Sequence, residues 1–226
     1  MITASTRLVA LLGRPVANSL SPRMHNAAFA ARGLDWAYVA LDVSPDRLSD
    51  SIRGLAAAGF AGANVTAPHK LAAAELCDEA EGDSVNTLVF RDGRIVGSST
   101  DTAVLDGLEF ERPMIVGDGG AAQAFRAALP NARVFSRRGQ WPPTADEADL
   151  VVNATPLRDD VLVELGPGQT LVDLPYPPGR FAAAARDAGA NVIDGLDVLA
   201  AQGALSFERW TGLPAPIEIM RAAIRS

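Results

Sequence analysis

Two side chains in the first half of the chain could together move the proton of an alcohol. Lys70 closes the stretch 62–70 and Asp101 closes the stretch 97–101. A lysine in the first turn of a helix lies where the helix carries partial positive charge, so its charged form is disfavoured and it can exchange a proton. Alcohol oxidation needs such a proton acceptor together with a hydride acceptor. The alternatives are a tolerated surface lysine and an Asp101 that only caps the segment from Thr102.

A pair of serines precedes a predicted helix and could hold a carboxylate. Ser21 is a good N-cap residue, and Pro22 suits the first helical position. Ser19 adds a second hydroxyl two residues earlier. Two hydroxyls beside a helix N-terminus can bind a carboxylate without an arginine. The alternative is that Ser21 only caps the helix and Ser19 has no role.

A glycine-rich turn predicts a dinucleotide phosphate site in the second half of the chain. The turn 117–122 reads G-D-G-G-A-A and fits G-x-G-x-x-A between an apolar strand and an alanine-rich helix. Its glycines allow the backbone to approach a pyrophosphate at the helix N-terminus. Asp118 places a carboxylate in this turn, which opposes phosphate binding. The alternative is an ordinary tight turn.

Two arginines after the next strand favour NADP over NAD. Arg137 and Arg138 follow the strand 133–135, at a point where NAD sites commonly carry an acidic residue for the ribose 2′-hydroxyl. A planar guanidinium instead suits a 2′-phosphate. The alternative is a pair of solvated surface charges.

Strands alternate with helices along the chain, which predicts an α/β fold with parallel sheets. The predicted strands span 8–12, 37–41, 62–65, 88–90, 114–116, 133–135, 150–153, 170–173 and 191–193. The predicted helices span 22–32, 45–58, 68–75, 121–129, 179–188 and 217–225. A change of composition near 101–113 indicates a second α/β unit. The segment from about Gln202 ends in a helix.

Composition bounds the class of protein. The 226 residues are 48% hydrophobic with a net charge of −7, and they include one cysteine and two histidines. An acidic chain disfavours nucleic-acid and anionic-membrane partners. The apolar runs are too short for a membrane helix, and the N-terminus does not resemble a signal peptide. One cysteine fits a reducing compartment. One cysteine and two histidines offer few zinc ligands, which disfavours a zinc site. We therefore expect a cytoplasmic protein without a bound metal.

Several motifs in one order resemble the shikimate dehydrogenase family over most of the chain. N-V-T-A-P-H-K at 64–70 is similar to the family's N-V-T-x-P-x-K, and S-L-S-P-R-M-H-N at 19–26 to its S-x-S-P-x-x-H-N. The stretches S-V-N-T-L, G-S-S-T-D, N-A-T-P and D-L-P-Y-P-P resemble further family segments. The stretch 195–212 is similar to the family's C-terminal motif. Ser84 and Ser99 depart from the usual alanine and asparagine.

The resemblance implies a role for each matching residue. Lys70 and Asp101 would be the catalytic pair. The substrate carboxylate and hydroxyls would be bound by Ser19, Ser21, Asn64, Thr66, Asn86 and Gln202, with Tyr176 lining the cleft. The cofactor would be bound by Gly117, Gly119, Gly120, Ala121, Ser136, Arg137, Arg138, Asn153, Thr155 and Gly195.

The resemblance also implies a fold and a reaction. An N-terminal α/β substrate domain would comprise 1–102 and 202–226, and a Rossmann-like dinucleotide-binding domain 103–201. The expected reaction is NADP-dependent interconversion of shikimate and 3-dehydroshikimate, in aromatic amino-acid (chorismate) biosynthesis, by a monomer or homodimer. A related substrate such as quinate or an amino-shikimate is an alternative, as is a non-catalytic binder.

The second domain is trimmed relative to this pattern. Only residues 139–148 separate the strand ending at Phe135 and its two arginines from the strand at 150–153. A parallel crossover usually needs a dozen or more residues, commonly with a helix. The predicted substrate site is therefore better preserved than the predicted cofactor site.

Overall fold

The computed structural model describes residues 2–226 and divides the chain into two compact units. The first comprises Met1–Thr100 and Ala200–Ser226, and the second Asp101–Leu199. The boundaries expected from the sequence, after 102 and after 201, each lie two residues further along the chain. Among the described residues, none of the helices has the length and apolarity that crossing a membrane would require.

The first unit is built on a six-stranded sheet with the order β2-β1-β3-β5-β6-β4. Its strands are β1 (Arg7–Gly13), β2 (Trp36–Asp42), β3 (Gly62–Val65), β4 (Glu79–Ala80), β5 (Thr87–Arg91) and β6 (Arg94–Ser98). The strands β2, β1 and β3 are parallel, and β5 runs antiparallel to both β3 and β6. The carboxyl ends of β1, β3 and β6 therefore share one edge with the start of β5.

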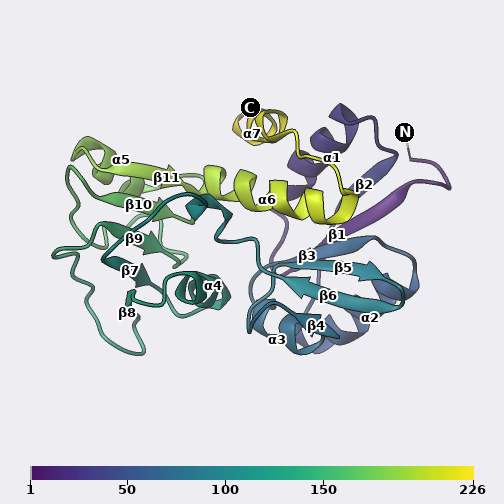
Figure 1. The fold of residues 1–226 in the computed structure, drawn as a ribbon, viewed down its shortest axis with the longest axis horizontal. Coiled ribbons are helices and arrows are strands. Elements are labelled where there is room, and N and C mark those ends of the chain that lie inside the picture. The colour runs from purple at the N-terminus through teal and green to yellow at the C-terminus, as the bar shows by residue number, and fades with distance from the viewer. Residues whose placement is uncertain (1) are drawn as a thin grey trace. The chain divides into compact units, whose positions relative to one another are not determined.

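Helices cover both faces of this sheet. The helices are α1 (Ser21–Ala31), α2 (Leu48–Ala57), α3 (Lys70–Glu75), α6 (Gly195–Thr211) and α7 (Ile217–Arg225), with a 3₁₀ turn at Pro45–Arg47. Figure 1 shows α2 and α3 on one side of the sheet, and α1, α7 and the C-terminal part of α6 on the other.

Alternating residues of β1 supply the two halves of this core. Ala10 and Leu12 pack in the cluster that includes Leu48 and Ile52 of α2. On the opposite face Phe29 of α1 stacks against Phe207 of α6, with ring centroids 5.5 Å apart. A strand buried on both faces reads as the continuous apolar run seen at 8–12, because side chains alternate across the sheet.

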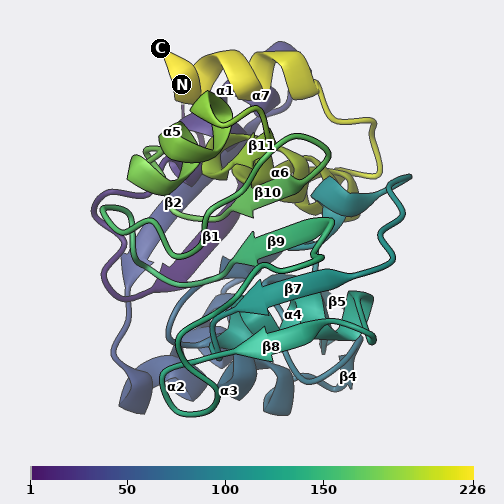
Figure 2. The same cartoon turned by 90° about the vertical axis from the view of Figure 1, so that its left-hand side faces the viewer.

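The second unit is a fully parallel five-stranded sheet with the order β11-β10-β9-β7-β8. Its strands are β7 (Pro113–Val116), β8 (Arg133–Phe135), β9 (Leu150–Asn153), β10 (Thr170–Asp173) and β11 (Asn191–Asp194). Figure 2 shows these five arrows side by side in that order. The chain passes from β7 to β8 on one side and then returns to β9 on the other side of β7.

Only two α-helices lie wholly within the second unit as the structure describes it. The helix α4 (Gly120–Ala128) contributes Phe125 to one face, and α5 (Arg180–Asp187) contributes Phe181 to the other. The described connections from β8 to β9 and from β9 to β10 contain no helix. Val163 and Leu165 of the second connection instead pack on the face that α5 covers. The missing crossover helix after β8 agrees with the short spacing in the sequence.

Four local predictions need correction. The helix expected over 45–58 is a 3₁₀ turn followed by α2, and the helix expected from Pro68 begins at Lys70. The strands β4 and β6 were not predicted. Helix α6 begins at Gly195, well before the C-terminal helical segment expected from about Gln202. Its first residues, Gly195–Leu199, belong to the second unit and the others to the first.

Candidate active site

The predicted substrate residues of the first unit gather at one edge of its sheet. We call Ser19, Ser21, Thr66, Lys70 and Asn86 the substrate edge. The two serines follow the end of β1, Thr66 and Lys70 follow the end of β3, and Asn86 precedes the start of β5. Since these strand ends coincide, the sheet topology brings together residues that are far apart in sequence.

The serine pair has a different geometry from the expected cap. Leu20 is the N-cap of α1, because its carbonyl accepts the first helical hydrogen bond from Met24 N–H at 3.0 Å. Ser21 is therefore the first residue of the helix and is buried, and it does not cap it. Ser19 Oγ accepts a hydrogen bond from Ser21 N–H at 3.3 Å, so Ser19 has a local role that the capping interpretation denied it.

Backbone contacts fix the segment that carries Lys70. Thr66 N–H donates to Leu12 C=O at 2.8 Å, and His69 N–H donates to Thr66 C=O at 2.9 Å. The His69 ring is bonded through Nε2 to Val43 C=O at 2.7 Å. These bonds close a turn over 66–69 before the helix, which explains why Pro68 lies outside α3. Lys70 is then the first helical residue, and its carbonyl accepts from Val85 N–H at 3.1 Å.

A buried hydrogen-bond network holds the amide of Asn86. Asn86 Oδ1 accepts from Thr100 N–H at 2.9 Å and from Thr87 Oγ1 at 2.9 Å. Asn86 Nδ2 donates to Gln202 Oε1 at 3.3 Å. Thr87 Oγ1 lies 2.8 Å from Ser206 Oγ on α6. The two amides predicted to bind substrate hydroxyls are thus bonded to one another within the first unit.

Asn64 is buried in the same network, and its polar atoms bond to protein groups. Its Nδ2 lies within hydrogen-bond distance of Asn86 C=O, Thr87 Oγ1 and Ser206 Oγ, at 3.0 to 3.1 Å. Its Oδ1 accepts from Tyr38 Oη at 2.8 Å. These bonds give Asn64 a clear structural role in fixing Asn86 and α6, and its predicted contact with substrate remains a prediction.

His25 is buried against this network without a hydrogen bond of its own. Its ring stacks on Tyr38 with centroids 4.5 Å apart, and neither ring nitrogen has a hydrogen-bond partner within residues 2–226. His25 therefore packs as an aromatic ring within the core. Burial lowers the pKa of His25 from 6.5 to about 3, so the ring is neutral at physiological pH.

Sequence reasoning missed several members of the network. Thr87 and Thr100 stand inside matched motifs but received no role, and Ser206 lies within the C-terminal motif. Tyr38 carried no signal of its own. Asn26 was also missed: its side chain donates to Tyr38 C=O and accepts from Tyr38 N–H, which fastens α1 to β2.

Asp101 follows directly on this network along the chain. Thr100, the preceding residue, is held by Asn86, and the Asp101 side chain is buried. The 3₁₀ turn at Ala103–Leu105 has Thr102 as its N-cap, so the alternative of Asp101 as the cap of this segment is wrong. The pairing of Asp101 with Lys70 remains a prediction.

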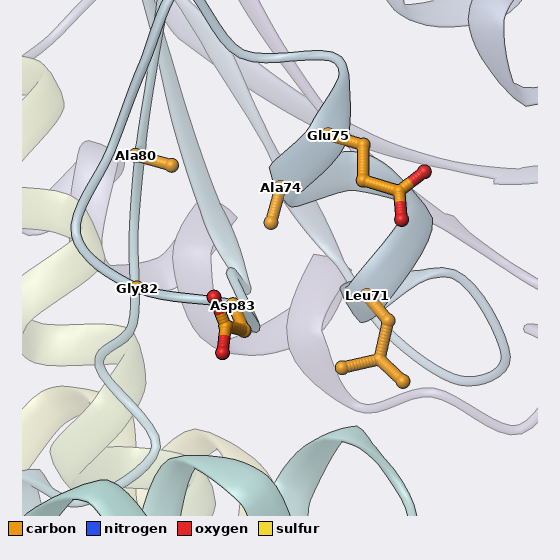
Figure 3. Close-up of a pocket in the computed structure, with 6 residues that line it drawn as sticks. All are labelled: Leu71, Ala74, Glu75, Ala80, Gly82 and Asp83. Atoms are coloured by element: carbon orange, nitrogen blue, oxygen red, sulfur yellow. The ribbon is translucent and has the colours of Figure 1, made fainter.

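A hollow of about 550 Å³ lies beside α3 but does not contain the predicted site. Leu71, Ala74 and Glu75 line it from the helix, and Ala80, Gly82 and Asp83 line it from the facing segment (Figure 3). Two carboxylates and no cationic side chain among these residues make a poor environment for an anionic substrate. None of the substrate-edge residues lines this hollow, so the edge itself is the better candidate site.

The predicted phosphate turn of the second unit follows the carboxyl end of β7, next to the carboxyl end of β9. The strand order reverses between these two strands, which is where doubly wound sheets bind ligands. Gly117 directly follows β7 with φ +135°, and a Cβ there would lie 2.8 Å from the Ala154 carbonyl oxygen, so only glycine fits. A Cβ on Gly119 would meet no atom within 4 Å. Gly119 is the N-cap of α4, and Gly120 and Ala121 form its first turn without a side-chain cap.

The residues after β8 form a closed turn beside the glycine-rich turn. Ser136 N–H donates to Gln140 C=O at 3.1 Å, and Gly139 N–H to Ser136 C=O at 3.0 Å. Arg137 and Arg138 are both exposed at this turn. Arg138 Nε lies 3.9 Å from Asp118 Oδ2, so the carboxylate that opposes phosphate binding has a cationic neighbour. These residues fit a phosphate-bearing dinucleotide.

Other predicted cofactor residues are tied into the strand ends. Asn153 Nδ2 donates to Asp173 Oδ1 at 2.7 Å, and Asn153 Oδ1 accepts from Thr155 Oγ1 at 2.7 Å. Burial raises the pKa of Asp173, whose Oδ2 has no hydrogen-bond partner in the described part of the chain. Tyr176 follows at the same edge, partly buried.

Gly195 is required by close packing at the start of α6. A Cβ there would lie 2.4 Å from Pro175 C=O. Asp194 before it accepts hydrogen bonds from the Leu196 and Asp197 N–H groups, which satisfies the helix N-terminus. Among the described residues, no group of three or more histidine, cysteine or acidic side chains could hold a metal ion.

Comparisons with known protein families match two stretches of the chain, one near each end. Residues 11–88 match the shikimate dehydrogenase substrate binding domain, and residues 195–225 match the shikimate 5′-dehydrogenase C-terminal domain. The NADP⁺ shikimate dehydrogenase of Moorella thermoacetica is 39% identical over 99% of this chain and 94% of its own length.

Solved structures agree in fold. A shikimate dehydrogenase crystallised with NADP⁺ has a TM-score of 0.89 at 31% identity, over 100% of this chain and 96% of its own. The shikimate 5-dehydrogenase of Thermus thermophilus, crystallised with NADP(H) and shikimate, has a TM-score of 0.85 at 33% identity, over 97% and 99% of the two chains.

The fold defines a two-unit α/β protein whose second unit is a parallel, Rossmann-like sheet with a glycine-rich turn after its first strand. The chain belongs to the shikimate dehydrogenase family.

Proposed function

We propose that the chain interconverts shikimate and 3-dehydroshikimate with NADP⁺ and NADPH. The observation that carries this proposal is the substrate edge, where Lys70 and two serine hydroxyls follow neighbouring strand ends beside the bonded Asn86 and Gln202. A cyclic polyhydroxy carboxylate needs both a carboxylate site and several hydrogen-bonding groups for hydroxyls. The named relatives, which match over nearly their whole length, support this substrate class.

Each residue of the edge has a chemical task in this proposal. Ser19 and Ser21 bind the substrate carboxylate near the start of α1. Thr66, Asn86 and Gln202 hold ring hydroxyls, and the network around Asn86 keeps its amide in one orientation. Such preorganisation favours reaction because the donors need no rearrangement as the substrate binds.

The proton is exchanged by Lys70 in this mechanism. As the alcohol is oxidised, the neutral amine of Lys70 takes the hydroxyl proton while the C–O bond becomes C=O. Bound NADP⁺ would supply the acceptor for the hydride that leaves the carbinol carbon. Asp101 shares the proton relay. In the reverse direction the ammonium of Lys70 returns the proton to the forming alkoxide.

The cofactor would be held by the second unit. Gly117, Gly119 and the first turn of α4 suit the pyrophosphate, because the backbone N–H groups at a helix N-terminus and the helix dipole favour anions there. Arg137 suits the 2′-phosphate, with Arg138 beside it, and the partner Asp118 makes Arg138 the weaker candidate.

A direct spectrophotometric assay on the purified chain tests the function. Shikimate with NADP⁺ should produce the absorbance of reduced nicotinamide, and NAD⁺ should support a lower rate. Quinate in place of shikimate tests the related substrate. Shikimate binding by calorimetry without reduction of either cofactor would instead identify a non-catalytic binder and overturn the proposal.

A further inference from the structure

An exposed tryptophan stands beside the arginine predicted to bind the 2′-phosphate. Trp141 lies in the helix-free connection between β8 and β9 and is 40% exposed, which is unusual for so large an apolar side chain. The Arg137 guanidinium carbon lies 5.7 Å from the centroid of the Trp141 ring. The cation and the ring therefore form a stack at the surface of the second unit.

The turn that carries this stack is held by its own backbone. The two hydrogen bonds between Ser136 and residues 139 and 140 close the chain immediately before Trp141. Pro142 and the buried Pro143 follow, and proline restricts the backbone after the ring. A large exposed ring on a restricted turn loses little conformational freedom when a ligand covers it.

We infer that Trp141 forms a stacking wall for the adenine ring of the dinucleotide cofactor, next to Arg137 at the 2′-phosphate. This inference rests on the proposed function. In NADP the adenine and the 2′-phosphate are attached to the same ribose, so a residue beside the 2′-phosphate site lies within reach of the base. Purine rings stack on aromatic side chains and on guanidinium planes, and here the two stand together.

The inference assigns different tasks to the two neighbours. Arg137 recognises the 2′-phosphate and so distinguishes NADP from NAD. Trp141 contacts the base, which both cofactors share, and so contributes to the affinity for either. The connection lacks a crossover helix, and the tryptophan supplies an apolar surface there instead.

Binding of adenosine 2′,5′-bisphosphate and of AMP tests this separation, by calorimetry on the full chain. Trp141→Ala should weaken the binding of both ligands by a similar factor, roughly tenfold, from the loss of base stacking. Trp141→Phe should retain most of the affinity. Arg137→Ala should weaken only the bisphosphate strongly, because AMP lacks the 2′-phosphate.

Trp36 provides a matched control in the first unit. Arg7 stacks over its ring at 4.6 Å, so this unit contains a similar arginine–tryptophan pair. Adenosine 2′,5′-bisphosphate should quench tryptophan fluorescence in the wild type and in Trp36→Phe, but not in Trp141→Phe.

Three outcomes would overturn the inference. One is unchanged affinity in Trp141→Ala, and another is a loss confined to the bisphosphate, since the ring would then only position Arg137. The third is quenching that survives in Trp141→Phe. If the wild type binds neither ligand and reduces no NADP⁺, the proposed function fails as well, and the two failures are thereby distinguished.

Discussion

The buried hydrogen-bond network of the first unit and the predicted cofactor turns of the second unit differ in how their polar groups are satisfied. Asn64, Asn86, Thr87 and Ser206 are buried and bonded to one another, with His25 and Tyr38 packed against them. In the second unit Asp118, Gly119 and both arginines are exposed, and the ion pair of Arg138 with Asp118 lies at the surface.

The difference shows two ways of preparing a binding site. Buried hydrogen bonds fix amide orientation strongly, because an unpaired polar group in the interior is costly. An exposed turn depends on its backbone geometry and on charged side chains, and ion pairs between exposed side chains are weak in water. The first unit should therefore be sensitive to the loss of a single hydroxyl, whereas the second should tolerate the loss of a surface charge.

The largest expected effect is on turnover at the substrate edge. Lys70→Ala should lower kcat by roughly 10²- to 10⁴-fold, the usual contribution of a positioned acid–base group, while the Kd for shikimate changes little. Steady-state kinetics and calorimetry measure the two quantities. Unchanged turnover would show that Lys70 takes no part in proton transfer.

The buried histidine should make stability depend on pH. The pKa of His25 is about 3 in the folded chain and 6.5 when exposed. The unfolded chain therefore binds a proton first as the pH falls. Stability present above pH 6.5 should be lost at roughly 1.4 kcal/mol per pH unit as the pH falls toward about 3. His25→Phe should reduce this dependence. Urea unfolding at several pH values measures it, and an identical slope in the variant would contradict the prediction.

The smallest effects compare the two regions directly. Ser206→Ala should lower the free energy of unfolding by about 1–3 kcal/mol, because Asn64, Thr87 and Thr100 each lose a hydrogen-bonding neighbour in the interior. Asp118→Asn removes an exposed ion pair and should change it by less than about 0.5 kcal/mol. If urea unfolding gave the same loss of free energy of unfolding for both variants, the contrast between the two regions would be contradicted.

The order of the motifs predicted the family. The strand ends were also predicted from the sequence, because the strands are short apolar runs. The turn at 117–122 and the helix after it were readable because glycines and a helical pattern stand next to each other. The N-caps were not readable. Ser21 has the residue type of a cap, yet the chain turns one residue earlier, at Leu20. Pro68 similarly favours a helix start, but the His69 bond to Val43 delays the helix until Lys70.

The partners of the network were hidden because they depend on pairings distant in sequence. Ser206 meets Thr87 across 119 residues, and Asn64 meets Tyr38 across 26. Nothing local marks a serine in an apolar helix as part of a hydrogen-bond network. The absent crossover helix was visible as a short spacing, but the loop residues that cover the sheet in its place were not.

The sequence by itself determined the alternation of strands and helices, the glycine-rich turn, and the residue types available for proton exchange and anion binding. These depend on local sterics and on periodicity, which neighbouring residues set. Only the tertiary structure decided that Asn86 and Gln202 are bonded to one another, that His25 has no hydrogen-bond partner, and that Trp141 stacks on Arg137. Those facts depend on strand order and on which faces pack together, because these decide which side chains are buried next to one another.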